Sequence, residues 1–241
     1  MKNGFSLAEV LITLGIVGVV ASVTLPTLNN NVQKQSYEAG AKKAYNIVSN
    51  AVSMYMVDQG VDDLSETPLY NNQDGLRAFV NKYFRVTIDC GNDYYSDKGA
   101  SCFSKEIYSL DHSAKTTLDA HCMHIVTIAD GMAFCFDSQT VTNISDGSDD
   151  SEDEVNVGDA NISSDTPLTI EVDINGPKGP NASGRDLFYM AVNRNGVVIS
   201  PPNSCVTTTQ EGRNACVAKY TKTAQPMTIG LLQYYGWKMK Y

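Results

Sequence analysis

The feature that most constrains this chain is an apolar stretch close to the start of its sequence. From Val10 to Leu28 no residue is charged, and nineteen residues is close to the roughly 20 that a helix needs to cross a bilayer. One carboxylate, Glu9, stands immediately before this run. A carboxylate at the edge of a membrane helix is costly and by default indicates a functional partner. The sequence therefore predicts a membrane-spanning helix in which Glu9 has a specific role.

The residues before this stretch are not those of an ordinary secretory signal. Such a signal carries its small-residue cleavage site after the apolar core, whereas here Gly4 precedes the core. The short basic leader MKNG, followed by Phe5 and SLAEVLITLGIVGVVASVTLP, resembles the leader of type IV prepilins over residues 1–30. An uncleaved signal anchor is the alternative interpretation. The resemblance implies that a prepilin peptidase cleaves between Gly4 and Phe5 and N-methylates Phe5, that Glu9 is the fifth residue of the mature chain, and that Pro26 is the helix-kinking proline of that family.

Cleavage would also create a partner for Glu9. The new α-amine of Phe5 would be mostly protonated at neutral pH, because an unperturbed α-amine has a pKa near 8. In an array of parallel helices, the Glu9 carboxylate of one subunit can meet the Phe5 amine of its neighbour. At roughly 4 Å and an effective dielectric constant of 20, the attraction is about 4 kcal/mol before desolvation. Removing one partner would leave the other buried and uncompensated, which is the costly case.

Beyond the apolar stretch, the sequence predicts an α+β fold. Apolar residues from Tyr37 to Tyr55 recur at spacings of three and four, which is typical of an amphipathic helix. Residues 76–83 predict a second short helix, with a cap near Asp74. HIVTIADGMAFCF predicts a hairpin that turns at residues 130–131, and residues 168–174, 187–192 and 196–200 predict further strands. This order favours a pilin-like roll, with a long N-terminal helix packed on an antiparallel sheet.

The expected organisation is one head on a helical stalk. We expect a leader at 1–4, a transmembrane and polymerisation helix at 5–28, its amphipathic continuation at 29–58 and a disulfide-stapled globular head at 59–241. The net charge is −9, but seven acidic residues and no basic residue lie in the window 146–159. Outside this acidic loop the chain is close to neutral. Nothing in its charge indicates a direct nucleic-acid partner, which would require a basic face.

The chain has six cysteines, an even number behind a membrane-targeting segment. This pattern predicts disulfides formed in an oxidising compartment, although six cysteines allow fifteen connectivities. The separations of 12, 13 and 11 residues favour pairing in sequence order, and free buried thiols are the alternative. The candidates are Cys90, Cys102, Cys122, Cys135, Cys205 and Cys216.

Two places carry oxygen ligands of the kind that calcium prefers. The acidic loop 146–159 has no frame that satisfies the EF-hand pattern, so a solvated surface loop is the favoured interpretation. Asp173 and Asn175, beside a turn rich in carbonyl groups, are the second candidate. His121, Cys122 and His124 lie close together but fit no standard structural zinc spacing. The sequence thus predicts no certain cofactor, with calcium as the candidate ion.

No catalytic motif is present, and we expect the protein not to be an enzyme. The prepilin resemblance implies a structural subunit that assembles into a type IV pilus or a type II secretion-like pseudopilus. It also implies a homopolymer or a mixed filament with other pilins, an assembly platform protein and ATPase as partners, and a single-pass membrane protein with a periplasmic or extracellular head. The alternative is a monomeric, membrane-tethered periplasmic binding domain with a prepilin-type leader. The shared N terminus does not separate major pilin, minor pilin and pseudopilin.

Overall fold

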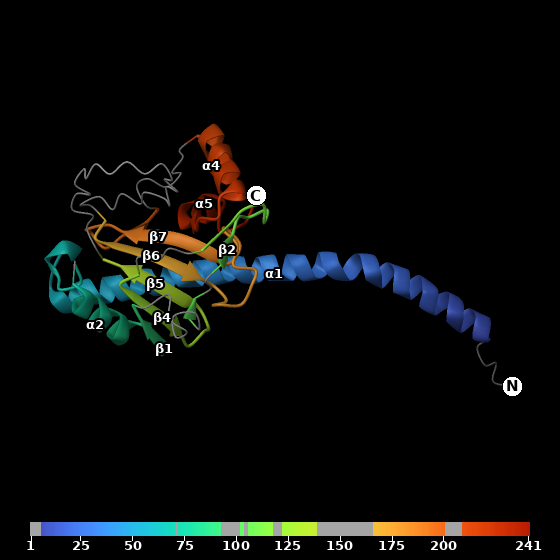
Figure 1. Cartoon of the computed structure of the whole chain (residues 1–241), viewed down its shortest axis with the longest axis horizontal. Helices are drawn as coiled ribbons and strands as arrows, with labels where there is room; N and C mark the ends of the chain where they lie inside the picture. The colour runs from blue at the N-terminus through green and yellow to red at the C-terminus, as the bar shows by residue number, and fades with distance from the viewer. Residues whose placement is uncertain are drawn as a thin grey trace, which may run out of the picture.

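The computed structural model describes residues 6–70, 72–92, 102–103, 106–117, 122–138, 166–200 and 209–241, with only the backbone of residues 26 and 27. One helix, α1 (Leu7–Gln59), runs from the N-terminal side into the head (Figure 1). Its 53 residues correspond to about 80 Å. It ends where the sequence predicts, because Gly60 adopts the left-handed conformation (φ 67°) and its N–H reaches the carbonyls of Met56 and Val57. The predicted α+β fold, a long N-terminal helix on an antiparallel sheet, is confirmed.

The head is built on one mixed sheet. Its strands are β1 (Val86–Gly91), β4 (His124–Ile128), β5 (Ala133–Asp137), β6 (Leu168–Asp173), β7 (Leu187–Val192) and β8 (Val198–Ile199), in that spatial order. All neighbours in this order are antiparallel, and β9 (Met227–Thr228) pairs in parallel with β7. Strands β2 (Glu106–Tyr108) and β3 (Lys115–Thr117) form a separate hairpin. The predicted hairpin at residues 130–131 is the β4–β5 turn, in which Gly131 has φ 80°.

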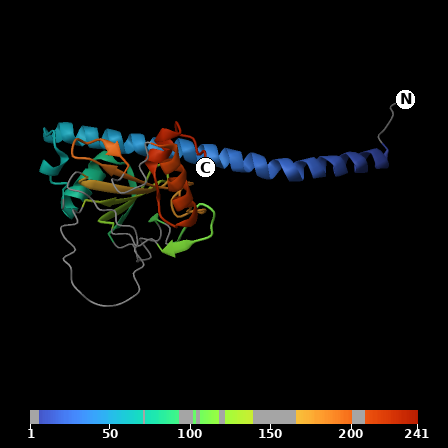
Figure 2. The ribbon, with the colours of Figure 1, turned by 90° about the horizontal axis from the view of Figure 1, so that it is seen from above.

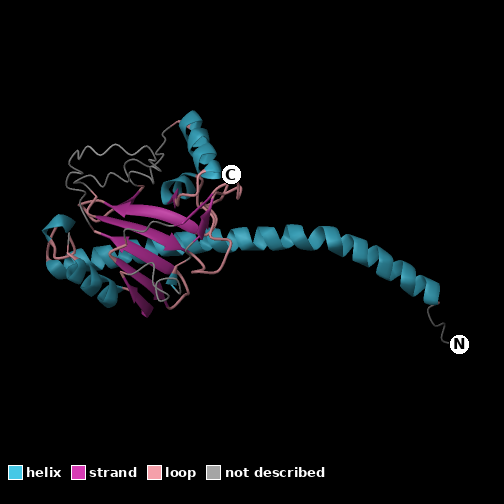
Figure 3. Ribbon diagram, in the orientation of Figure 1, coloured by secondary structure: helices cyan, strands magenta, loops and turns pink. Residues whose placement is uncertain are grey.

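Helices flank the sheet, as Figure 3 shows. They are α2 (Gln73–Tyr83), the short 3-10 helix η1 (Leu64–Glu66), α4 (Gln210–Lys222) and α5 (Ile229–Tyr234). The predicted second helix is therefore present as α2. Its N-cap is Asn72 rather than Asp74, because the Asn72 side chain accepts the backbone N–H groups of Asp74 and Gly75.

The C-terminal half of α1 packs on one face of the sheet. Alternate residues of each strand face the same side, and here that side meets the small apolar stripe of α1. The shared core includes Ala44, Val48, Val52, Phe134, Ile170, Val172 and Phe188. Gly40 allows a close approach, because a Cβ atom there would lie 2.2 Å from Ile174 Cγ2. The head is thus fixed to α1 from about residue 37 onward, and the first half of the helix is left outside it.

Candidate functional site: the projecting helix and its junction with the head

The N-terminal half of α1 projects away from the head, as the two views at right angles agree (Figures 1 and 2). Its large apolar side chains are exposed, for example Leu7 at 79% and Val23 at 69%. This helix is long and apolar enough to cross a membrane, and no part of its most apolar 18-residue window is buried. A continuous apolar surface of this extent needs lipid or another chain to cover it.

Three hydroxyl groups inside the apolar half donate hydrogen bonds within the helix itself. The hydroxyl of Thr13 donates to the carbonyl oxygen of Glu9 at 2.9 Å, and the Ser22 hydroxyl donates to that of Val19 at 2.7 Å. Thr24 likewise donates to Val20. Such back-bonding removes the need for water, which is what a hydrocarbon environment demands.

Glu9 has a partner within its own chain that the sequence reasoning missed. The Glu9 carboxylate oxygen Oε2 accepts the Ser6 backbone N–H and the Ser6 hydroxyl, each at 2.9 Å, and the Glu9 N–H donates back to Ser6 Oγ at 3.3 Å. These contacts form a capping box, whose signal S-x-x-E is present in the sequence as SLAE. Glu9 therefore fixes the first turn of α1. The predicted cleavage residues Gly4 and Phe5 lie outside the described residues, and Pro26 lies within the continuous helix.

At the junction with the head, α1 binds the C-terminal tail. Glu38 on α1 is 6% exposed; its carboxylate accepts the Met239 N–H at 2.8 Å and the Lys238 ammonium at 2.9 Å. Burial acts to raise the pKa of Glu38, but these two hydrogen bonds, together with the positive charges of Lys238 and Lys34, hold the pKa below its usual value. Trp237 packs on Tyr45 of α1, with ring centroids 5.3 Å apart. The C-terminal tail is thus bound to the stalk helix.

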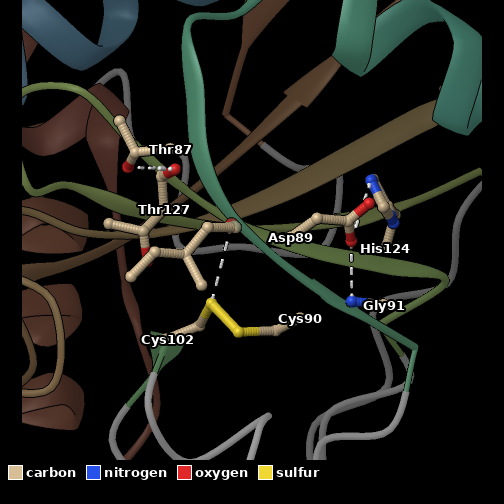
Figure 4. The surroundings of a disulfide bond; sticks show 8 residues. Thr87, Asp89, Cys90, Gly91, Cys102, His124 and Thr127 are labelled. Atoms are coloured by element: carbon tan, nitrogen blue, oxygen red, sulfur yellow. Dashed lines mark hydrogen bonds and ion pairs between the residues drawn. A yellow bond between two sulfur atoms is a disulfide. The ribbon is translucent and has the colours of Figure 1, made fainter.

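Two disulfides brace the side of the sheet that carries β1 and β4. Cys90 is bonded to Cys102, with a Cα–Cα distance of 6.3 Å (Figure 4). Cys122 is bonded to Cys135, with a Cα–Cα distance of 5.4 Å. These are the first two pairs in sequence order. Cys216 is buried in α4, whereas Cys205 lies outside the described residues, so the third pair stays a prediction.

His124 lies buried beside the first disulfide. Its side chain is 0% exposed, both ring nitrogens lack a hydrogen-bond partner, and Nε2 lies 3.8 Å from an Asp89 carboxylate oxygen (Figure 4). Burial lowers the pKa of His124, while the nearby Asp89 opposes that shift. The metal hypothesis for this region loses one ligand, because the Cys122 sulfur is in a disulfide; His121 lies outside the described residues. Among the residues that the structure describes, no three His, Cys, Asp or Glu side chains cluster as metal ligands.

The second calcium candidate lies in the turn between β6 and β7. Asp173 Oδ1 accepts the Asn175 N–H at 3.2 Å, and the Asp186 carboxylate accepts the N–H groups of Asn181 and Ala182. Sequence analysis missed Asp186, because only the β6–β7 pairing brings it near Asp173. Burial raises the pKa of both carboxyls, and their mutual repulsion raises that of Asp173 further. The acidic loop 146–159, the first calcium candidate, lies outside the described residues.

Comparison with known proteins adds one curated relative. The chain is 35% identical to the type II secretion system core protein G of Escherichia coli strain K12 over 107 residues, which cover 39% of this chain and 70% of that protein. No protein-family model matches the chain, and no solved structure matches it either. The long apolar N-terminal helix and the helix-on-sheet head described above agree with this relationship. This protein therefore belongs to the family of the type II secretion system core protein G, a pseudopilin.

Proposed function

We propose that this chain is a structural subunit, not an enzyme, that assembles into a type II secretion-like pseudopilus or a type IV pilus. One observation carries the proposal: a half-helix whose large apolar side chains, from Leu7 to Leu28 among the described residues, are exposed is continuous with a half that is fixed to the head. Such a helix serves first as a membrane span and then, packed against copies of itself, as the core of a filament. Membership in the core protein G family supports this role.

The proposal includes processing of the N terminus. A prepilin peptidase removes residues 1–4 and methylates Phe5, and the helix from 5 to 28 then holds the subunit in the membrane with its head, 59–241, on the periplasmic or extracellular side. Residues 29–58 continue the helix into the head. An assembly platform protein and ATPase move the subunit from the membrane into a homopolymer or a mixed filament, so the subunit itself needs no catalytic site.

Glu9 is proposed to set the register between subunits. Both of its hydrogen bonds to Ser6 end on Oε2, so Oε1 accepts none among the described residues. That oxygen is able to accept the methylated amine of Phe5 from a neighbouring subunit without disrupting the capping box. The Glu9 carboxylate would thus accept hydrogen bonds from its own helix through Oε2 and from a neighbouring subunit through Oε1. In this way it would couple the first turn of α1 to assembly.

Shearing cells and measuring the subunit in the filament fraction tests this proposal. Wild-type subunit is expected in sheared, high-molecular-weight material. The Glu9→Ala variant is expected to stay in the membrane fraction, because the apolar helix is intact, and to be strongly depleted from sheared filaments. Glu66→Ala, an exposed head glutamate, is the matched control and should assemble normally. Wild-type filament levels from Glu9→Ala would contradict the role of Glu9. A wild-type subunit found only as a membrane-bound monomer would favour the tethered binding domain instead.

A further inference from the structure

The end of the head nearest the projecting helix carries a group of exposed basic side chains. We call this group the basal collar. They come from three separate parts of the chain: α1, the β6–β7 turn and the C-terminal tail. The collar consists of Lys34, Lys178, Arg185, Lys238 and Lys240.

Contacts around Tyr37 and Glu38 bring these three parts together. The Tyr241 hydroxyl donates to the Gly184 carbonyl at 3.1 Å, which places the tail against the β6–β7 turn next to Arg185. The Asn175 amide donates to the Tyr37 hydroxyl at 3.5 Å, which attaches the same turn to α1. The tail itself is bound to Glu38, as described above. Figures 1 and 2 both show the C terminus beside α1 where the helix leaves the head.

Few ionised acids oppose the collar among the described residues. Glu38 is a single negative charge that pairs with Lys238 and also interacts with Lys34. The carboxyls of Asp173 and Asp186 are buried under the turn, where burial disfavours their charged form. The neighbouring Asp130 and Glu106 are each paired with a lysine of their own, Lys43 and Lys115. After Glu38 and the α-carboxylate of Tyr241 are counted, the five bases still leave the collar positive, on a chain whose net charge is −9.

The position of the collar along α1 places it just outside the layer of lipid headgroups. The uncharged apolar run ends at Leu28, and at 1.5 Å per residue Lys34 follows about 9 Å later and Glu38 about 15 Å later. The polar region of a bilayer adds about 5–8 Å on each side of its hydrocarbon core. Lysine side chains are long, and charges act over a Debye length of about 8 Å at physiological salt. The collar is thus within range of phosphate groups when the apolar run fills the hydrocarbon core.

We propose that the basal collar binds the anionic phospholipid headgroups of the membrane that holds α1. This inference rests on the proposed function, because it requires the apolar half of α1 to span the membrane. It goes further by giving the head a partner before assembly: the basal collar binds the anionic leaflet, and the head is released when the subunit leaves the bilayer. Each base near such a surface strengthens binding by a factor of about five, so a few exposed bases suffice to hold the head.

The single tryptophan provides a direct probe of this contact, because Trp237 lies next to Lys238 in the tail. The full-length protein is reconstituted at low density into vesicles of phosphatidylcholine, with or without phosphatidylglycerol, each containing a lipid with a nitroxide on its headgroup. Quenching of Trp237 reports how closely the base of the head approaches the lipid surface. We expect more quenching in the anionic vesicles, and its loss in about 1 M NaCl, where the Debye length is about 3 Å.

Two double variants with equal charge change separate the collar from a general charge effect. Lys178→Gln/Arg185→Gln should reduce the ratio of docked to undocked heads by about tenfold or more. Arg77→Gln/Arg85→Gln removes two exposed charges, one on α2 and one just after it, which are not members of the collar, and should leave the ratio unchanged. Equal quenching in both kinds of vesicle, or equal loss in both variants, would overturn the proposal. Quenching that rises with protein density instead of phosphatidylglycerol would show a contact between subunits and would also overturn it.

Failure of the proposed function gives a different result. If α1 does not span the bilayer, alkaline carbonate releases the protein from both kinds of vesicle. If only the collar inference is wrong, the protein resists carbonate and Trp237 quenching still does not depend on phosphatidylglycerol.

Discussion

Replacing Glu38 tests how the head is attached to its helix. The carboxylate is almost fully buried and accepts one backbone N–H, from Met239, and one ammonium group, from Lys238. A hydrogen bond to a charged group contributes about 1.5–3 kcal/mol. The ion pair adds at most about 1 kcal/mol, because the Lys238 side chain is 61% exposed. Glu38→Ala removes both and should cost about 3 kcal/mol.

Thermal melts of the detergent-solubilised full chain measure this cost. For a domain of 150–250 residues, 1 kcal/mol corresponds to about 2–4 °C, so Glu38→Ala should lower Tm by about 6–12 °C. Glu38→Gln can still accept the Met239 N–H and should lose only about 1 kcal/mol, the charged part of the interaction. Trp237 fluorescence follows the same transition locally, because its ring packs on Tyr45 of α1. Glu66→Gln, an exposed glutamate, is the control.

The pH dependence gives a second check on the same pair. The folded-state pKa of Glu38 is lowered, so its ionised form stabilises the fold above the unfolded pKa, near 4.5, and this contribution disappears as pH falls through the folded pKa. The Tm difference between wild type and Glu38→Gln should therefore shrink below about pH 4. If Glu38→Ala melts with the wild type, the tail is not held through Glu38 and the reasoning is refuted.

Three further predictions concern the head. Burial lowers the folded-state pKa of His124 below its unfolded value near 6.5, so its contribution to stability is complete above that pH and falls as pH decreases. In thermal melts at pH 7 and pH 5, His124→Phe should lose less stability than wild type over this interval. Identical pH profiles for the two proteins would contradict this prediction. Glu171 should show the opposite pH dependence: its Oε2 lacks a hydrogen-bond partner and burial raises its pKa to about 7. The free energy of unfolding should therefore fall as pH rises from about 4.5 through 7, and at pH 8 Glu171→Gln should be about 2 kcal/mol more stable than wild type. Equal stability of the two proteins at pH 8 would contradict this prediction. A double serine substitution that removes the Cys122–Cys135 bond, which spans 13 residues, should lower the free energy of unfolding by about 3 kcal/mol, as measured by urea denaturation. An unchanged urea midpoint would show that the bond does not constrain the unfolded chain.

Segments with a regular apolar repeat over several residues made most of the fold predictable. The helix to residue 58, the hairpin at 130–131 and the strands at 168–174 and 187–192 each have a strong apolar repeat, and the structure has them within one or two residues. The strand predicted at 196–200 is shorter, with β8 covering only Val198–Ile199. Strand β1 was missed because only one of its six residues, Cys90, is buried, and α4 was missed because QEGRNACVAKYTK has no clear apolar stripe.

The candidate site was predictable only where its residues are close in sequence. The capping box is local and its S-x-x-E pattern is present in the sequence as SLAE, although the sequence analysis did not identify it. Glu38 and Met239 are 201 residues apart, and Asp186 approaches Asp173 only through strand pairing. No local sequence pattern therefore predicts either contact. The basal collar combines three distant segments for the same reason. Tertiary contacts of this kind follow from the fold and not from spacing along the chain.

The mass of the intact chain, purified from the membrane of cells that contain a prepilin peptidase, tests the central claim most directly. The account predicts a chain that begins at Phe5 with one added methyl group, lighter than the full sequence by the residues Met-Lys-Asn-Gly. Tandem fragmentation of the N-terminal peptide would place that methyl group on the Phe5 amine. A mature, membrane-extracted chain that still carries Met-Lys-Asn-Gly would contradict the assignment.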